Sequence, residues 1–364
     1  MTKSVPVIFP VDPDPNLANG ASSTFITYLN HLRYEYTLDL NIGVCQMHSA
    51  EILRENHTNF DWMNGILLEY SHHPLNTGES LPSIFPIPQA YVHGHYDLHG
   101  VEDRNQIYFP WYFAEACTKP DIIDTNYSRT APGYARDEKT YNFSCLNRNP
   151  KAERCWLYVQ LHRTRFFNNT ITSFYPRYTW DADIDIQNLT GYMGKDLAGF
   201  FANEIMPTLP HCTQDDLELW KSSPGHFTRD IAHPGFSDAY VNIISEHNYE
   251  LPFLSEKTVK PIAAGQLFLM AGPKGSIKHL EDLGFDVFRD YIDHDYYDNE
   301  SFTWTRLEKM IKIAESLNQV GARDVYHATY YRRERNRSHL FSEDLRNRIY
   351  RPIRQWIRNE LNPK

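Results

Sequence analysis

After residue 140, apolar runs alternate with helically periodic segments, and this alternation constrains the fold of the chain more than any other feature. The apolar runs predict strands at residues 142–146, 170–174, 239–244, 266–270 and 286–288. Apolar residues at helical spacing predict helices at residues 150–163, 196–206, 258–264, 277–283 and 304–320. Ser276 is expected to cap the helix at 277–283, and Gly284 to end it. Strands that alternate with helices form parallel sheets covered by helices, so the sequence predicts an α/β fold.

The first part of the chain also carries short apolar runs, but they are broken by many turn residues. They predict strands at residues 5–9, 43–47, 65–70, 90–93 and 106–108. The polar stretch Thr118–Lys139, which contains prolines and a glycine, is the best linker. Because 364 residues exceed one ordinary core, we expect two domains with a cleft between them, at residues 1–138 and 139–340. Residues 341–364 form a helix with one apolar stripe, which Pro352 is expected to kink.

The sequence carries no sign of a membrane span or of export. It has no apolar run long enough to cross a bilayer, and the run near its start is too short for a signal peptide. The five cysteines are scattered, odd in number and without CxxC pairs, which favours a reducing compartment over a disulfide framework. We therefore expect a cytoplasmic protein, of a host or a bacterial cell.

The stretch FLSEKTVKPIAAG, which begins at Phe253, places Glu256 and Lys257 side by side at the expected start of a helix. A helix start exposes backbone N–H groups and a partial positive charge, which suit phosphate oxygens. Lys257 adds a full charge, and Glu256 can accept hydrogen bonds from sugar hydroxyls. Glu246 and His247 stand at the end of the preceding strand. This stretch predicts a phosphate or nucleotide-sugar site.

A second stretch, FSCLNRNPKAERCW, has a similar layout. A strand ends near Asn147, a turn follows through Pro150, and Arg154 lies in the first turns of a helix. A basic residue near the turn of a strand–turn–helix unit is typical of an anion-binding site. The alternative is that Arg154 is an ordinary charge on the helix surface.

Together these two stretches resemble the donor-binding half of the alpha-1,3-fucosyltransferase family. The Asn-x-Asn-Pro-x-x-x-Arg turn of that family stands here from Asn147 to Arg154. Its Phe-Glu-Asn-Ser and Tyr-Ile-Thr-Glu-Lys elements stand here as residues 245–248 and 253–257, and its Gly-x-x-Pro-Val-x-x-Gly strand as residues 265–272. Residues 275–286 resemble a variant found in viral and bacterial fucosyltransferase-like proteins. The resemblance covers roughly residues 140–290.

The resemblance implies a GT-B fold, in which two Rossmann-like domains face a central cleft and a C-terminal helix crosses back to the first domain. It implies an inverting, metal-independent glycosyltransferase that needs no cofactor and takes a nucleotide-diphosphate sugar as co-substrate. Arg154 and Lys257 then hold the diphosphate, and Glu256 holds the ribose or the sugar. The implied donor-binding residues are Asn147, Arg154, Glu246, His247, Phe253, Ser255, Glu256 and Lys257.

Three departures from the family pattern leave the nucleotide base and the sugar open. The Asn of the first element is His247 here, the Tyr of the second is Phe253, and the Pro-Val pair is Phe268-Leu269.

The acceptor hydroxyl needs a general base, and a carboxylate of the first domain is the usual choice. The Glu-Ser-Pro element of the family resembles the stretch from Glu69 to Pro74, at the end of a predicted strand. Glu69 is therefore the first candidate for the base, and Asp97 and His95 follow it.

The stretch AYVHGHYDLHG supports an alternative function. His93, His95, Asp97 and His99 nearly spell the His-x-His-x-Asp-His motif of metallo-beta-lactamase-like hydrolases, but Leu98 breaks the spacing. Otherwise these residues line the acceptor side of the cleft or are plain structural histidines. A zinc metallohydrolase is therefore the second hypothesis for the function, and a non-catalytic nucleotide- or sugar-binding module the third. The acidic runs at residues 181–185 and 293–295 are interpreted as surface loops.

Basic residues gather at the end of an otherwise acidic chain. Residues 323–364 carry 11 Lys or Arg and 5 Asp or Glu, a net of +6 against −10 for the whole chain. A glycan or small-molecule acceptor is the first hypothesis. Hydroxylated bases of phage DNA are the second, because some phage enzymes of the GT-B architecture glycosylate DNA. Binding DNA takes several phosphate contacts, so Arg332, Arg333, Arg335 and Arg337 would have to face one side.

Overall fold

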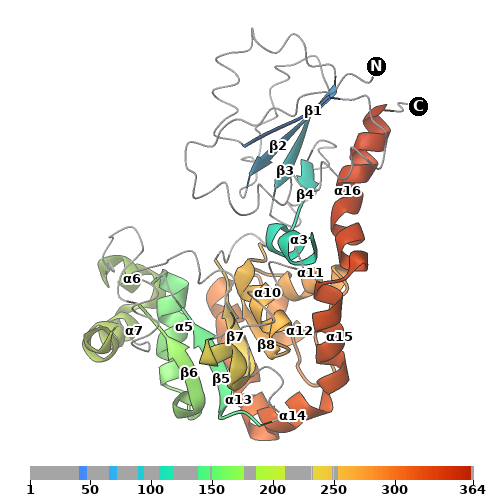
Figure 1. Cartoon of the computed structure of the whole chain (residues 1–364). Coiled ribbons are helices and arrows are strands. Elements are labelled where there is room, and N and C mark those ends of the chain that lie inside the picture. The colour runs from blue at the N-terminus through green and yellow to red at the C-terminus, as the bar shows by residue number, and fades with distance from the viewer. Residues whose placement is uncertain are drawn as a thin grey trace. The chain divides into compact units, whose positions relative to one another are not determined.

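The computed structural model describes the chain in two compact units (Figure 1). The described residues are 41–46, 65–71, 89–93, 106–118, 138–147, 150–175, 186–209, 231, 233–247, 249 and 253–361. Unit 1 comprises Met1–Pro120 with Phe341–Lys364, and unit 2 comprises Asp121–Leu340.

Unit 1 contains a parallel sheet of four described strands, in the order β1-β2-β3-β4. The strands are β1 (Asn41–Gln46), β2 (Gly65–Ser71), β3 (Gln89–His93) and β4 (Gln106–Tyr108). All four were predicted from their apolar runs, to within two residues at each end, and the predicted strand at 5–9 lies outside the described residues. The helix α3 (Trp111–Thr118) follows β4 and was not predicted.

The last helix of the chain, α16 (Glu343–Leu361), belongs to unit 1 and packs against α3 and β4. Its apolar stripe is buried at Leu345, Ile349 and Ile353, and the ring of Tyr350 lies 5.2 Å from that of Phe109. The sequence predicted a helix with this stripe. The helix continues through Pro352, although a proline removes one helical hydrogen bond and its ring crowds the carbonyl four residues earlier.

Unit 2 contains a second parallel sheet of four described strands, in the order β6-β5-β7-β8 (Figure 1). The strands are β5 (Tyr141–Leu146), β6 (Thr170–Ser173), β7 (Ala239–Ser245) and β8 (Leu267–Ala271). Every residue of β7 and β8 is buried, as expected for strands covered by helices on both faces.

Helices follow and cover the strands of unit 2. They are α5 (Ala152–His162), α6 (Ile186–Met193), α7 (Lys195–Phe200), α9 (Pro234–Ser237), α10 (Glu256–Ala263), α11 (Ser276–Asp282), α12 (Asp295–Asp298), α13 (Thr303–Val320), α14 (Ala322–Ala328) and α15 (Tyr330–Leu340). The predicted helix at 196–206 is α7 continued by a π-helical segment, Phe201–Ile205. The predicted helix at 304–320 is α13, and its apolar residues from Leu307 to Leu317 are buried on one stripe.

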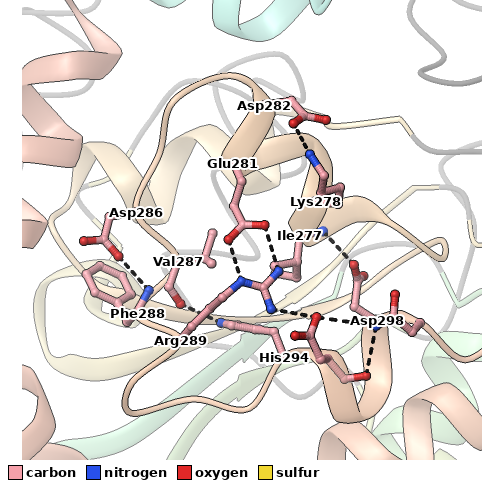
Figure 2. A network of polar contacts seen from close by, with 12 residues as sticks. Ile277, Lys278, Glu281, Asp282, Asp286, Val287, Phe288, Arg289, His294 and Asp298 are labelled. Atoms are coloured by element: carbon pink, nitrogen blue, oxygen red, sulfur yellow. Dashed lines mark hydrogen bonds and ion pairs between the residues drawn. The ribbon is translucent and has the colours of Figure 1, made fainter.

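The predicted strand at residues 286–288 is wrong. Val287 and Phe288 are buried, but Phe288 has a φ of 61°, which interrupts an extended backbone. The Phe288 N–H donates to the Asp286 carboxylate at 2.8 Å (Figure 2). The Asp286 N–H donates to the amide oxygen of Asn336 at 2.8 Å. The backbone N–H groups of Asp286 and Phe288 therefore donate to side-chain oxygens and not to a neighbouring strand.

The predicted cap of α11 is also wrong. The helix begins one residue earlier than expected, after Gly275 with a φ of 80°, and the Ser276 hydroxyl donates to the carbonyl of Pro273 at 2.7 Å. The Asp298 carboxylate takes the cap position instead and accepts from the Ile277 N–H at 3.2 Å (Figure 2). As predicted, Gly284 follows the helix, with a φ of 98°.

The described chain is thus a mixed α/β protein with parallel sheets and many helices, which is compatible with Rossmann-like folding. None of the helices in its described part is both long enough and apolar enough to span a membrane.

Candidate functional site

The order of the strands in unit 2 creates a topological switch point between β5 and β7. These two strands are neighbours, but the chain leaving β5 leads to β6 on one side and the chain leaving β7 leads to β8 on the other. In open parallel sheets, ligands bind beyond the carboxyl ends of the strands at such a point. The two stretches that the sequence singled out follow β5 and β7, so the fold brings them together there.

Arg154 joins the two stretches directly. It lies in the first turns of α5, and its side chain is 1% exposed. Its Nη2 atom donates to the backbone carbonyl of Glu246 at 3.0 Å and contacts that of Ser245 at 3.5 Å. The guanidinium therefore anchors the end of β7 while it brings a fixed positive charge to the switch point.

Lys151 makes a second bridge that the sequence analysis missed. Its Nζ atom donates to the backbone carbonyl of His247 at 2.6 Å. Desolvation, then the nearby charges of Arg154 and Lys257, lower the pKa of Lys151. A basic residue directly after Pro150, at the entry to a helix, was the signal that could have found it.

Glu246 is fully buried and fixes the start of α10. Its carboxylate accepts from the His247 N–H at 3.1 Å, from the Ser255 N–H at 3.0 Å and from the Ser255 hydroxyl at 2.6 Å. The Thr258 hydroxyl also donates to it. With these four bonds, the carboxylate positions the loop after β7 and the first turn of α10.

The start of α10 explains why the chain places Glu256 beside Lys257. Ser255 is the N-cap, and its hydroxyl oxygen accepts from the Lys257 N–H at 3.2 Å. The Lys257 ammonium lies 2.7 Å from the Glu256 carboxylate. Burial raises the pKa of Glu256, but the charge and hydrogen bond of Lys257 outweigh burial and bring this pKa to about 2. Glu256 is therefore ionised at neutral pH and holds Lys257 in place by their ion pair. Phe253, two residues before the cap, is buried.

Positive charges from both stretches converge on His247, whose side chain is exposed. Partial desolvation of its ring and the charges of Lys151, Lys257 and Arg154 lower its pKa to about 4, while Glu256 acts in the opposite direction. Desolvation and the surrounding cations together keep the imidazole uncharged at neutral pH. The site is thus electrostatically prepared for an anion.

Asn147 leaves a polar atom unsatisfied at the same place. The residue is 1% exposed, and its amide donates to the Cys145 sulfur at 3.3 Å. Within the described residues, its Oδ1 atom is buried and has no hydrogen-bond partner. Buried polar atoms are usually paired, so this oxygen is a candidate acceptor for a group of a ligand.

The candidate residues of unit 1 are only partly described. Glu69 lies in β2, where its backbone pairs in register with Cys45 and Tyr91, and His93 is the last residue of β3. His95, Asp97 and His99 lie outside the described residues, so the predicted base and the predicted zinc site remain predictions. In the ranges that the structure describes, no group of three or more His, Cys, Asp or Glu could hold a metal ion.

One of the two acidic runs can be placed. Asp293 and Asp295 are exposed, and Asp295 forms an ion pair of 2.6 Å with Arg289. The two aspartates thus lie on the surface, as interpreted, but Asp295 begins α12 and is not in a loop, and His294 between them is buried. The run at 181–185 lies outside the described residues.

Two of the arginines of α15, Arg332 and Arg333, are engaged within unit 2. Arg332 pairs with Asp286 and with Asp290, each at 2.6 Å. Arg333 is buried with its guanidinium 3.3 Å from the centre of the Tyr326 ring. The condition for a DNA-binding face, that the four arginines of α15 point to one side, is therefore not met.

The protein matches no family model, and comparisons with curated proteins and with solved structures give no match.

Proposed function

We propose that this protein is a glycosyltransferase that takes its sugar from a nucleotide-diphosphate sugar and transfers it to a hydroxyl acceptor. The observation that carries the proposal is the convergence of Lys151, Arg154 and Lys257 on the switch point of the unit 2 sheet. A diphosphate is the common anion that suits several fixed cations at the start of a helix. The fucosyltransferase-like motifs at the same residues favour a sugar nucleotide over other diphosphates.

The chemistry follows from the charge that develops in such a transfer. The acceptor oxygen attacks the anomeric carbon, the bond from that carbon to the diphosphate oxygen breaks, and the acceptor proton passes to a base. The nucleoside diphosphate leaves with one more negative charge than it had in the donor. Fixed cations around the phosphates stabilise that charge in the transition state, in the role that a metal ion has in other transferases.

Each residue has a separate role in this proposal. Lys257, Lys151 and Arg154 face the diphosphate, and Arg154 and Glu246 also fix the loop after β7. The Oδ1 atom of Asn147 can accept a hydrogen bond from a hydroxyl or amide group of the sugar nucleotide. Glu69 of unit 1 is the proposed base. The GT-B arrangement, with the acceptor bound by unit 1 and the donor by unit 2, is part of the proposal.

The acceptor is proposed to be a glycan or a small molecule. DNA is the weaker alternative, because Arg332 and Arg333 are committed to contacts within unit 2.

A panel of nucleotide-diphosphate sugars tests the proposal. Thermal denaturation is measured with UDP-glucose, GDP-mannose, GDP-fucose and dTDP-glucose, and release of the nucleoside diphosphate is then followed with the stabilising donor. We expect at least one donor to raise the melting temperature, and its consumption to continue in the presence of EDTA. A protein that no donor stabilises, or one whose activity is lost with EDTA, contradicts the proposal.

A matched pair of variants ties the result to the site. Lys257 and Lys312 are both lysines paired with a glutamate, at 2.7 Å and 2.8 Å, but Lys312 lies on the exposed side of α13. Lys257→Ala should lose most donor stabilisation, and Lys312→Ala should keep it.

A further inference from the structure

His247 stands at the centre of the candidate site with its backbone held on both sides. Its N–H donates to the Glu246 carboxylate at 3.1 Å, and its carbonyl accepts from Lys151 at 2.6 Å. The side chain remains exposed. The imidazole is thus presented to solvent from a fixed backbone, which is bonded to Lys151 at the start of α5 and, through Glu246, to Ser255 at the start of α10.

The charged groups around this imidazole come from each neighbouring element. From the start of α5, Lys151 donates to the backbone carbonyl of His247 and Arg154 to that of Glu246. Lys257 and Glu256 form their ion pair at the start of α10, and the charges of all four residues act on the imidazole. On its own segment, the Glu246 carboxylate is occupied by its hydrogen bonds to the loop and to α10. Cations therefore outnumber accessible carboxylates, and an imidazolium here is repelled as long as no ligand is bound.

We propose that His247 takes up one proton when a nucleotide-diphosphate group binds among these cations. This inference rests on the proposed function. The negative charge of the anion compensates the charges of Lys151, Arg154 and Lys257 and also offsets the desolvation of the ring, so the imidazolium becomes favourable. The proton comes from solvent, and both ring N–H groups become donors. A charged N–H donates a stronger hydrogen bond to a phosphate oxygen than a neutral one does.

The coupling makes the affinity for the donor depend on pH. Desolvation and the surrounding cations hold the pKa of His247 at about 4 in the free site. If the bound anion restores the ordinary pKa of about 6.5, the complex holds one more proton than the free protein between these two values. Lowering the pH then favours the complex, by about twentyfold between about pH 7 and about pH 5.

The measurement is isothermal titration calorimetry in two buffers of different ionisation enthalpy, which counts the protons taken up. The probe is the sugar nucleotide of the panel above that binds most tightly. Both phosphates of a sugar nucleotide are diesters that do not titrate near neutral pH, so a measured proton belongs to the protein. Binding is compared at about pH 5.5 and about pH 7.5, on either side of the ordinary histidine pKa.

Two variants make the result specific. His247→Asn replaces the imidazole with a neutral polar side chain of similar reach. His327→Asn is the control, because His327 is also exposed but contacts Tyr240 at the opposite end of β7, with ring centres 6.3 Å apart.

The expected result is uptake of about one proton per ligand near the lower pH in the native protein and in His327→Asn, and none in His247→Asn. Binding without proton uptake, or with equal uptake in His247→Asn, overturns this inference and leaves the proposed function intact. Failure of every sugar nucleotide to bind at either pH overturns the proposed function, and this inference with it.

Discussion

The ammonium of Lys151 donates to the backbone carbonyl of His247 at 2.6 Å and so joins the turn after β5 to the turn after β7. The two residues are 96 positions apart in the chain. This contact brings the charges of both stretches to one place, the switch point of the sheet.

Lys151→Ala should therefore weaken donor binding although no family motif marks this residue. Loss of one charged hydrogen bond to a phosphate costs about 1.5–3 kcal/mol, which is a loss of about tenfold or more in affinity. Calorimetric titration with the stabilising sugar nucleotide measures the change. Lys312→Ala is again the control. Unchanged affinity in Lys151→Ala would restrict the site to Arg154 and Lys257.

The bond between Thr258 and Glu246 should matter for stability. Thr258→Val removes the hydroxyl that donates to this buried carboxylate and keeps the shape of the side chain. We expect the free energy of unfolding to fall by about 1–3 kcal/mol, because a buried acceptor loses a partner. Thr140 also donates to a carboxylate, that of Asp238, but on the surface, so Thr140→Val should cost about 0.5 kcal/mol or less. Chemical denaturation of both variants measures the difference, and equal losses would contradict the anchoring role of Glu246.

Glu69→Gln tests the proposed base. The amide cannot accept the proton of the acceptor, so transfer should fall by about a hundredfold or more, while sugar-nucleotide affinity stays unchanged. Initial rates and calorimetric affinities are compared for the native protein, Glu69→Gln and the surface control Glu308→Gln. Parallel losses of rate and affinity in Glu69→Gln would point to a structural role.

Two buried histidines predict how stability changes with pH. The His294 Nε2 atom lies 2.8 Å from the Val287 carbonyl (Figure 2), which can only accept, so this nitrogen carries the proton. The other nitrogen then accepts from the Tyr297 hydroxyl at 2.6 Å. Desolvation lowers the pKa of His294 and of His279 to about 3. Both histidines are therefore neutral in the folded protein.

Unfolding exposes these histidines, and below their ordinary pKa of about 6.5 the unfolded chain binds protons that the folded chain does not. The stability that the two neutral histidines contribute is therefore fully present above pH 6.5 and is lost as the pH falls from there towards 3. Burial raises the pKa of Asp298 to about 6, so this group opposes the loss between pH 6 and its ordinary value of 3.8. His247, whose pKa is lowered to about 4, adds to this loss as a third group. We expect a net loss of at least about 2 kcal/mol between about pH 7 and about pH 5, measured by urea denaturation. Constant or rising stability over this interval would contradict the neutral state of the two histidines.

Local patterns were enough to predict most of the described elements. The stripe of α13 and the runs that form β5, β7 and β8 are properties of consecutive residues, so their bounds agree with the prediction to within two residues. The strand predicted at residues 286–288 was wrong because apolar residues can be buried outside a sheet. Phe288 is apolar and buried, but it packs under Arg332 at 5.3 Å from its ring centre and not in a sheet.

The site was predictable as a set of residues but not as a set of contacts. Glu256 and Lys257 were expected to contact a sugar and a phosphate, and their ion pair of 2.7 Å with each other was not predicted. Nor was it predicted that Ser255 and Thr258, 9 and 12 positions further along, donate to the Glu246 carboxylate. Such bonds depend on how the loop after β7 closes over the sheet, and no local pattern encodes that closure.

The measurement that tests the central claim most directly compares the affinity of a nucleoside diphosphate with that of its parent nucleoside. Calorimetric titrations use the native protein and the double variant Lys151→Ala/Lys257→Ala, in the presence of EDTA, with UDP and GDP as ligands and uridine and guanosine as references. If the diphosphate is bound by these cations, one diphosphate should bind the native protein at least about a hundredfold more tightly than its nucleoside, and the double variant should lose most of that difference. Equal affinity of diphosphate and nucleoside, or an undiminished difference in the double variant, would contradict a diphosphate site at the switch point between β5 and β7.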